Sequence, residues 1–320
     1  MQIKEELKNS FTSYWSFMTL RTACQLNLFD AVKSENYSVN ELNKKLKTDL
    51  KSLTTLINAL IELKTLKIID NKLRLSSKGE LLTNDNPDSL KQACILWGEE
   101  HLDAWKNLSY TIKTGTPSFE KVYGTSFFNY LASDKNKLYN YHKAMAEYAV
   151  DDYKNITDVF NFSEFSSITD VGGGLGILIK YIYNTYPDKI FNLVELPEVI
   201  ALIEDDKKVN LYSTDFFKSI PIQSDLIILS RVLHDWNDEK AKIILENCLQ
   251  SLSENGKILI IEILQEDINA NLLSLNMLTI CESFERTSIE YRNLIEKVGL
   301  TITKKVKLNN LQTILTLEKQ

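Results

Sequence analysis

The stretch Asp170-Val-Gly-Gly-Gly-Leu-Gly176 decides the fold class of this sequence, because it holds four of the chain's ten glycines. Ten glycines in 320 residues is about half of the usual share of roughly 7%. Glycine adopts positive φ angles at little cost and lets a ligand approach the main chain closely. A chain that is sparing with glycine but gathers it in one turn is therefore typical of a ligand-binding loop.

The residues around this turn alternate between short apolar runs and helical segments. A strand at 168–171 leads through the glycines into a helix that reaches residue 186. Further strands are expected at 191–196, 211–214, 226–229 and 257–263, with a helix at 238–252. This repeated order predicts an α/β fold with a mainly parallel, Rossmann-like sheet. Ligands of such sheets bind at the carboxyl ends of the strands, so we expect a nucleotide cofactor at the glycine turn.

The first 90 residues follow a different pattern. Ser38 and Glu41 have the spacing of a capping box at a helix start. Apolar residues at helical spacing follow over 50–63, and residues 68–75 have the pattern of a hairpin. Helix, helix and hairpin is the order of a winged helix. We therefore predict three parts, namely a winged-helix-like domain at 1–90, a helical, aromatic-rich connector at 91–155 and the Rossmann-like domain at 156–320.

Composition and charge narrow the functional class. Hydrophobic residues make up 44% and charged residues 25%, which excludes a disordered chain. The net charge of -6 argues against nucleic acid as a partner. We see no apolar run near the ~20 residues of a membrane span and no secretory signal at the start, so we expect a cytoplasmic protein away from the membrane. We expect the four cysteines to be reduced thiols, namely Cys24, Cys94, Cys248 and Cys281.

The strand ends indicate which nucleotide cofactor binds. The glycine spacing fails the dinucleotide fingerprint, because Ile177 and Ile179 stand where its last glycine or alanine should be. Glu195 ends the second strand, where a carboxylate can accept hydrogen bonds from both ribose hydroxyls. Asp215 and Phe216 follow the third strand and could contact the amine and the ring of adenine. The alternative for an acid at a strand end is a helix cap.

A histidine follows the fourth strand, in Ser230-Arg-Val-Leu-His-Asp-Trp236. His234 lies on the ligand edge of the predicted sheet, whereas the other two histidines are expected to be structural. Glu262 or Glu285 could hydrogen-bond one imidazole nitrogen, which would fix its tautomer and raise its basicity. For Glu285 the alternative is an acid near a helix start. The histidines are scattered and no His/acid cluster has metal-ligand spacing, so we expect no metal site.

Together these motifs resemble the plant-type small-molecule O-methyltransferase family, which includes hydroxyindole, caffeate-type and bacterial tailoring enzymes. The resemblance covers nearly the whole chain, and the order of its motifs makes it specific. The motifs that carry it are Asp170-Val-Gly-Gly-Gly-Leu-Gly176, Val194-Glu-Leu-Pro197, Asp215-Phe-Phe217, Arg231-Val-Leu-His-Asp-Trp236, Asn276-Met-Leu278 and Glu285-Arg-Thr287.

The resemblance implies a class I methyltransferase that binds S-adenosylmethionine, releases S-adenosylhomocysteine and methylates a hydroxyl, expected to be phenolic, of an aromatic or polyketide-like metabolite. It implies that His234 is the general base between Glu262 and Glu285, and that the N-terminal domain forms a homodimer. The cofactor residues it implies are Asp170, Gly172, Gly174, Glu195, Thr214, Asp215, Phe216, Ser230 and Arg231. The expected acceptor residues are Asn276, Met277, Trp105 and Met145.

Two other functions remain open at this point. A relative with the same cofactor could methylate nitrogen or carbon, or could have lost methylation altogether. A winged-helix regulator would need several basic residues on its DNA-facing helix, and residues 50–63 offer only Lys51.

Overall fold

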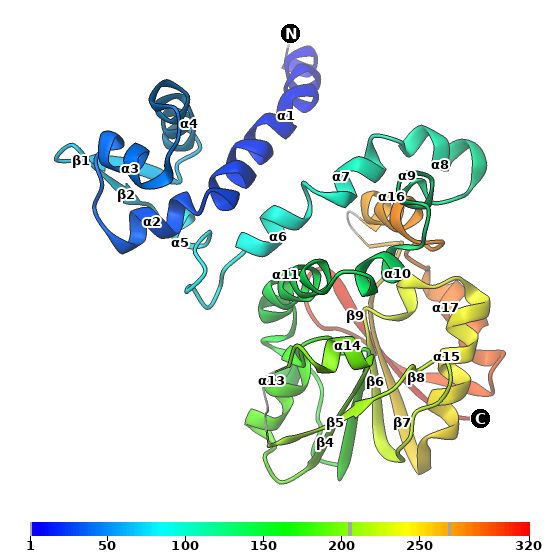
Figure 1. Cartoon of the computed structure of the whole chain (residues 1–320). Helices are drawn as coiled ribbons and strands as arrows, with labels where there is room; N and C mark the ends of the chain where they lie inside the picture. The colour runs from blue at the N-terminus through cyan, green and yellow to red at the C-terminus, as the bar shows by residue number, and fades with distance from the viewer. Residues whose placement is uncertain (1, 204–206, 268–269) are drawn as a thin grey trace. The chain divides into compact units, whose positions relative to one another are not determined.

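The computed structural model describes residues 2–203, 207–267 and 270–320 (Figure 1). The chain divides into two compact units, residues 1–100 and 101–320. Part of the predicted connector, helix α6 (Lys91–Leu96), belongs to the first unit, and the helices from α8 (Leu108–Thr114) onward belong to the second. None of the described helices is both long and apolar enough to cross a membrane.

The first unit is helical with one small hairpin. The predicted capping box is confirmed, because Ser38 and Glu41 each bond the other's backbone N–H group. Asp70 and Asn71 have φ angles of 51° and 58° and form the turn of the predicted antiparallel hairpin. Its elements are α1 (Gln2–Gln25), α2 (Leu28–Ser34), α3 (Val39–Leu46), α4 (Leu50–Glu62), β1 (Leu66–Ile69), β2 (Lys72–Leu75), α5 (Ser77–Glu80) and α6.

Helix α1 carries a row of large apolar side chains that the described part of this chain leaves exposed. Their spacing of three and four residues places them on one face of the helix. Their exposed fractions run from 56% to 82%, which is unusual for a contiguous set of this size. We call this set the apolar stripe, and it consists of Ile3, Leu7, Phe11, Tyr14 and Trp15.

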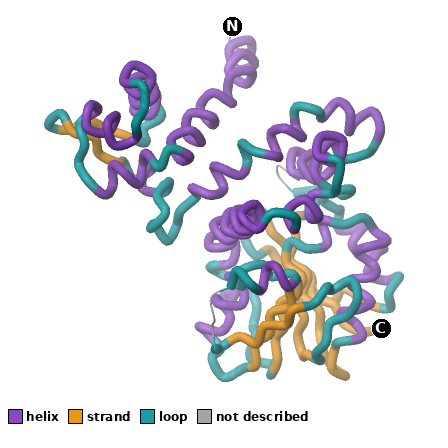
Figure 2. Tube along the Cα trace, in the orientation of Figure 1, coloured by secondary structure: helices purple, strands orange, loops and turns teal. Residues whose placement is uncertain are grey.

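The second unit contains the predicted α/β sheet beneath a group of short helices (Figure 2). The helices that precede the sheet are α7 (Glu100–Trp105), α8, α9 (Ser118–Tyr123), α10 (Phe127–Ala132), α11 (Lys135–Tyr153) and α12 (Ile156–Val159). The remaining elements are β3 (Ser167–Val171), α13 (Ile177–Thr185), β4 (Ile190–Glu195), α14 (Pro197–Ile200), β5 (Val209–Ser213), β6 (Ser224–Ser230), η1 (Leu233–Asp235), α15 (Asp238–Gln250), β7 (Leu252–Ile263), α16 (Ala270–Ile280), α17 (Ser288–Glu296), β8 (Leu300–Lys307) and β9 (Gln312–Lys319).

Seven strands of the described residues form one mixed sheet in the order β5-β4-β3-β6-β7-β9-β8. Strands β3 to β7 are parallel, which confirms the predicted Rossmann-like core. The chain leaves β3 toward β4 on one side and returns to β6 on the other. This reversal leaves a crevice at the carboxyl end of β3, where the glycine turn lies.

The antiparallel strands β8 and β9 are the part of the sheet for which the sequence analysis assigns no element. Strand β9 is buried along most of its length because it lies between β7 and β8. A short apolar run of this kind lacks the alternation that identifies a half-buried strand. Apolar cores pack on both faces of the sheet, one with α15 and α17 and the other with α12 and α13.

Candidate active site

The glycine turn after β3 is shaped so that side chains would not fit. Gly172, Gly174 and Gly176 have φ angles of 72°, 58° and 73°, a region that other residues rarely adopt. A Cβ atom on Gly173 would lie 2.2 Å from a carboxylate oxygen of Asp170. One on Gly172 would lie 2.9 Å from a methyl group of Val232. The turn therefore brings bare main chain to the strand edge, as a cofactor cradle requires.

Two buried carboxyl groups lie beside this turn. Neither oxygen of Asp170 has a hydrogen-bond partner among the residues that the structure describes. Burial and the charge of Glu195 raise the pKa of Asp170 to about 7. Burial also raises the pKa of Glu195 to about 7, although its carboxylate accepts backbone N–H groups of Gly174 and Leu196, each at 2.9 Å. Both groups would gain from a polar ligand with hydrogen-bond donors or positive charge.

The residues after β5 form one wall of this cradle. The backbone N–H of Thr214 donates to the carbonyl of Glu195, and a carboxylate oxygen of Asp215 accepts the N–H of Phe217 at 3.0 Å. This bond closes a turn, and no described helix begins directly after Asp215, so the helix cap expected as its alternative role is not formed. An edge carbon of the Phe216 ring lies 3.4 Å from where a Cβ of Gly172 would be, so the ring lies beside the glycine turn.

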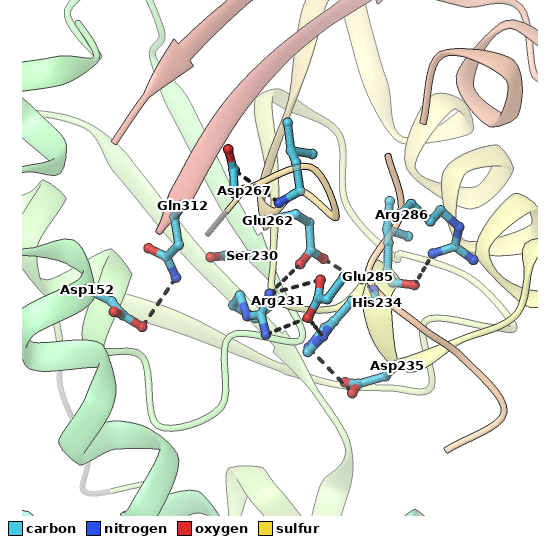
Figure 3. Close-up of polar contacts among 12 residues, drawn as sticks. Asp152, Ser230, Arg231, His234, Asp235, Glu262, Asp267, Glu285, Arg286 and Gln312 are labelled. Carbon is cyan, nitrogen blue, oxygen red and sulfur yellow. Dashed lines mark hydrogen bonds and ion pairs between the residues drawn. The ribbon is translucent and has the colours of Figure 1, made fainter. Parts of the chain in front are cut away.

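Protein groups already engage the side chains of Ser230 and Arg231 at the end of β6. The Ser230 hydroxyl lies 2.6 Å from the Tyr153 hydroxyl. The Arg231 guanidinium forms ion pairs with Glu262 at 3.2 Å and with Glu285 at 3.1 Å. The side chain of Arg231 therefore lies between the two predicted catalytic acids (Figure 3).

His234 lies in the short turn η1 and is buried. Its Nδ1 lies 3.0 Å from a carboxylate oxygen of Glu285, and its Nε2 lies 3.5 Å from Asp235. Glu262 does not bond the ring; it accepts the backbone N–H of His234 at 3.3 Å. Burial and Arg231 lower the pKa of His234, but Asp235, Glu285 and Glu262 together outweigh them and raise it.

The protonation of Glu285 sets the tautomer of this histidine. Burial opposes ionisation of the carboxyl, yet Arg231 and His234 lower the pKa of Glu285 to about 2. An ionised carboxylate can only accept, so Nδ1 of His234 carries the proton and donates it to Glu285. In the neutral ring Nε2 then has a free lone pair. This arrangement can accept a proton from a ligand hydroxyl.

The expectation that no His/acid cluster has metal-ligand spacing is wrong. His234, Glu262 and Glu285 each offer a ligand atom, and these atoms lie within 4.8 Å of one another. Sequence spacing misses the cluster because its members come from three distant segments that meet at the sheet edge. The guanidinium of Arg231 pairs with both carboxylates, so a cation would have to displace it.

The four predicted acceptor residues differ in their surroundings. Asn276 accepts a hydrogen bond from the indole N–H of Trp105 at 2.8 Å, which joins α16 to α7. Met277 is 5% exposed and packs in an apolar cluster with residues of α9 and α10. Met145 is half-buried on α11. The structure thus pairs Trp105 with Asn276, while the side chain of Met277 belongs mainly to the core of the helical layer.

Two residues that the structure places at the site, Arg286 and His142, are not predicted as site residues from the sequence. Arg286 donates to the carbonyls of Leu233 and Trp236 at 2.7 and 2.6 Å and so clamps the turn that holds His234. His142, expected to be structural, has its Nδ1 3.4 Å from where a Cβ of Gly174 would be. The only signal for Arg286 is its position next to Glu285, and the sequence offers no signal that places His142 at the glycine turn.

Comparison with known proteins identifies the family. Residues 105–301 match the O-methyltransferase domain, and residues 9–78 match the O-methyltransferase dimerisation domain. The chain is 28% identical over 308 residues to phenazine O-methyltransferase PhzM of Lysobacter antibioticus, with 92% of this chain and 90% of that protein covered.

Two further comparisons agree with this result. Acetylserotonin O-methyltransferase of Gallus gallus is 26% identical over 303 residues, with 87% of this chain and 86% of that protein covered. The crystal structure of LaPhzM superposes with a TM-score of 0.94 at 27% identity and covers 99% of both chains. The chain therefore belongs to the family of S-adenosylmethionine-dependent O-methyltransferases that carry an N-terminal dimerisation domain.

Proposed function

We propose that this enzyme methylates a phenolic hydroxyl of a small aromatic metabolite and that His234 removes the phenol's proton. The observation that carries the proposal is the 3.0 Å contact between His234 Nδ1 and an ionised Glu285, at the strand edge that also bears the glycine turn. A phenol, with a pKa of ~10, is mostly protonated at neutral pH and needs a base to become a good nucleophile.

The residues of the glycine turn fit S-adenosylmethionine. The bare main chain of Gly172 and Gly174 can receive its amino-acid end, and the unpartnered carboxyl of Asp170 can accept its ammonium group. Glu195 keeps lone pairs for the ribose hydroxyls, and Phe216 offers a ring face to adenine. When bound, the cofactor supplies a methyl group that its sulfonium already activates, so the protein mainly has to align the acceptor.

The proton then moves within the chain's own groups. The neutral ring of His234 accepts the phenol proton at Nε2 while Nδ1 remains bonded to Glu285. The resulting imidazolium lies between Glu285 at 3.0 Å and Asp235 at 3.5 Å, which stabilise its charge. Glu262 holds the backbone of the histidine in place.

An aromatic acceptor suits the helical layer of the second unit. Rings of α9, α10 and α11 pack edge to face there, with Phe127 and Tyr141 at 5.3 Å between centroids. Phe128 stacks on Trp236, two residues after the base. The names of two relatives contain aromatic compounds. They are phenazine O-methyltransferase PhzM and 3-amino-4-hydroxybenzoate 4-O-methyltransferase. We propose that Trp105 and Asn276, held together by their hydrogen bond, and Met145 contact the acceptor.

The apolar stripe of α1 supports a homodimer. Its five large apolar side chains are more than half exposed in the single chain, and the matched dimerisation domain includes Phe11, Tyr14 and Trp15. A second copy of the chain would remove this surface from water.

The test is a methylation assay on a panel of hydroxylated aromatic compounds, with S-adenosylmethionine and mass detection. We expect at least one phenol to gain a single methyl group on oxygen. His234→Asn, which keeps a similar shape but no base, should lower the rate by ~10²–10⁴. A loss of less than about tenfold, or methylation on nitrogen or carbon alone, would contradict the proposal.

A further inference from the structure

Arg231 has an unusual backbone at a central place in the site. It follows the last residue of β6 and has a φ angle of 56°, which is uncommon for a residue other than glycine. Its N–H nevertheless donates to the carbonyl of Ile261 on β7. Such conformations cost free energy and persist where surrounding contacts impose them, most often at functional sites.

The hydrogen bonds that the structure shows for the Arg231 side chain go to the predicted catalytic acids. Nη1 of Arg231 donates to Glu262 at 3.2 Å and to Glu285 at 3.4 Å, and Nη2 donates to Glu285 at 3.1 Å. The Glu285 oxygen that accepts Nη2 also lies 3.0 Å from Nδ1 of His234. Figure 3 shows the guanidinium and the imidazole meeting at this carboxylate.

The charges of the cluster require a fixed cation. The side chains of Glu262 and Glu285 are fully buried, and two neighbouring buried carboxylates cannot both stay ionised without one. An arginine suits this place because its planar fork can bond both acids and its charge is permanent. Several charged and titratable groups interact with Arg231. Among the described residues these are Glu262 on β7, Glu285 before α17, His234 and Asp235 on η1, Tyr141, Asp152 and Tyr153 on α11, and Tyr291 on α17.

We infer that Arg231 is a positioning residue for the base, because its guanidinium bonds Glu285 and holds that carboxylate in line with Nδ1 of His234. Glu262 balances the guanidinium and anchors the backbone of the same histidine. This role differs from the cofactor contact implied by the family resemblance, and it rests on the proposed function of His234 as the base.

The role predicts a direction for the pH profile. The charge of Arg231 lowers the pKa of His234 and also that of Glu285. Without this charge the pKa values of His234 and Glu285 both rise, so the pair releases its proton at a higher pH. The histidine must be neutral to accept a proton, so the rise of kcat with pH should move to higher pH.

The test compares Arg231→Met with Arg231→Lys and with Arg292→Met, an exposed arginine on α17 that serves as the control. We expect Arg231→Met to lower kcat by about 100-fold at pH 7, to change KM less than threefold and to move the pH profile upward. Arg231→Lys keeps the charge but cannot bridge both acids as a fork does, so it should lose less and leave the profile in place. Arg292→Met should resemble the wild type.

A charge-balance variant separates this role from simple packing. In Arg231→Met/Glu262→Gln one buried carboxylate is removed with the arginine, and we expect about tenfold recovery of kcat over Arg231→Met. A packing role predicts no recovery. If Arg231→Met does not fold, the double variant is compared with Glu262→Gln alone, and the pH profile is taken from the double variant and Arg231→Lys. We then expect the profile of Arg231→Lys to stay in place and that of the double variant to differ from it, and identical profiles and rates in all three variants would overturn the inference.

A second readout does not depend on the acceptor. The Nδ1 proton of His234 should give a low-field NMR signal that is present in the wild type and weakened or lost in Arg231→Met. If the signal is lost in Arg231→Met but the wild type methylates no phenol, the role of Arg231 is upheld and the proposed function is contradicted. An unchanged signal and pH profile, with affinity lost only for S-adenosylhomocysteine, would return Arg231 to the cofactor site.

Discussion

The side chains around His234 and those on the exposed face of α1 differ in their burial and in their partners. Around His234, Glu262 and Glu285 are buried and Arg231 is half-buried, and each of them meets an oppositely charged or polar partner in the same chain. On α1, large apolar side chains such as Phe11 and Trp15 remain exposed at 65% and 60%. The charged groups proposed to transfer the proton are thus paired within one chain, whereas the apolar stripe of α1 is the surface that we propose a second copy of the chain covers.

The largest effect should come from breaking the buried contact on the base. Glu285→Gln removes the charge that holds Nδ1–H of His234, so we expect kcat to fall by ~10²–10³. Glu262→Gln is the matched variant. Among the described residues, Glu262 bonds the backbone N–H of His234 and the side chain of Arg231 but not the imidazole ring, so we expect this variant to lose only about tenfold in kcat. Steady-state kinetics of the two variants measures the difference. Equal losses would mean that the structure's distinction between the acids has no bearing on catalysis.

The next effect concerns the exposed side of the comparison. Phe11→Asp places a charge in the middle of the apolar stripe, and burying it in a dimer would be costly. We expect the dimer dissociation constant to rise by about 100-fold, as followed by analytical ultracentrifugation. Asn9→Asp adds the same charge on the opposite face of α1 and should leave association unchanged. The same weakening in both variants would show that net charge, and not the stripe, controls assembly.

The third prediction concerns the contribution to stability of Asp170, the buried carboxyl beside the glycine turn. The pKa of Asp170 is about 7 against its usual 3.8, so the folded chain binds this proton more tightly than the unfolded chain. Its contribution to stability is therefore present at low pH and is lost as the pH rises through about 7.

In the absence of cofactor, Asp170→Asn should reduce the fall in unfolding free energy between pH 5 and pH 8 by on the order of 2 kcal/mol. Urea unfolding at both pH values measures it, with the exposed Glu254→Gln as the control. A fall as steep as that of the wild type would contradict the assignment of a raised pKa to Asp170.

The smallest effect is local to the first unit. The side chain of Asp49 caps α4 by accepting the N–H of Ser52 at 2.9 Å. Asp49→Ala should lower the free energy of unfolding by ~1 kcal/mol and leave the kcat of the folded enzyme unchanged. Thermal unfolding and a rate measurement on the same sample check both parts. A large loss of kcat would show that this helix contributes to the chemistry.

Local patterns predict much of this structure because they act over a few residues. The capping box of Ser38 and Glu41, the turn at Asp70 and Asn71 and the glycine turn at Gly172 each follow from adjacent residues and hold in the structure. The parallel strands follow from their apolar runs. The sequence does not predict the buried strand β9, because its residues have no polar and apolar alternation.

Contacts between distant residues could not be predicted in the same way. Arg231 meets Glu262 and Glu285 across 31 and 54 residues, and Trp105 meets Asn276 across 171. The sequence indicates that acids accompany His234, but only the meeting of three segments at the sheet edge distinguishes Glu285 on the ring from Glu262 on the backbone. The same meeting creates the His/Glu cluster that spacing had excluded.

We propose that His234 removes the acceptor's proton, and this role is tested by changing how strongly the acceptor holds that proton. Single-turnover methylation rates of the wild type and His234→Ala are compared over a series of acceptor phenols of decreasing pKa. We expect a loss of ~10²–10⁴ for a phenol of pKa ~10, shrinking toward no loss for a phenol that is already ionised at the assay pH. An equal loss for every phenol would contradict the claim, because it would show that His234 acts in some way other than as a base.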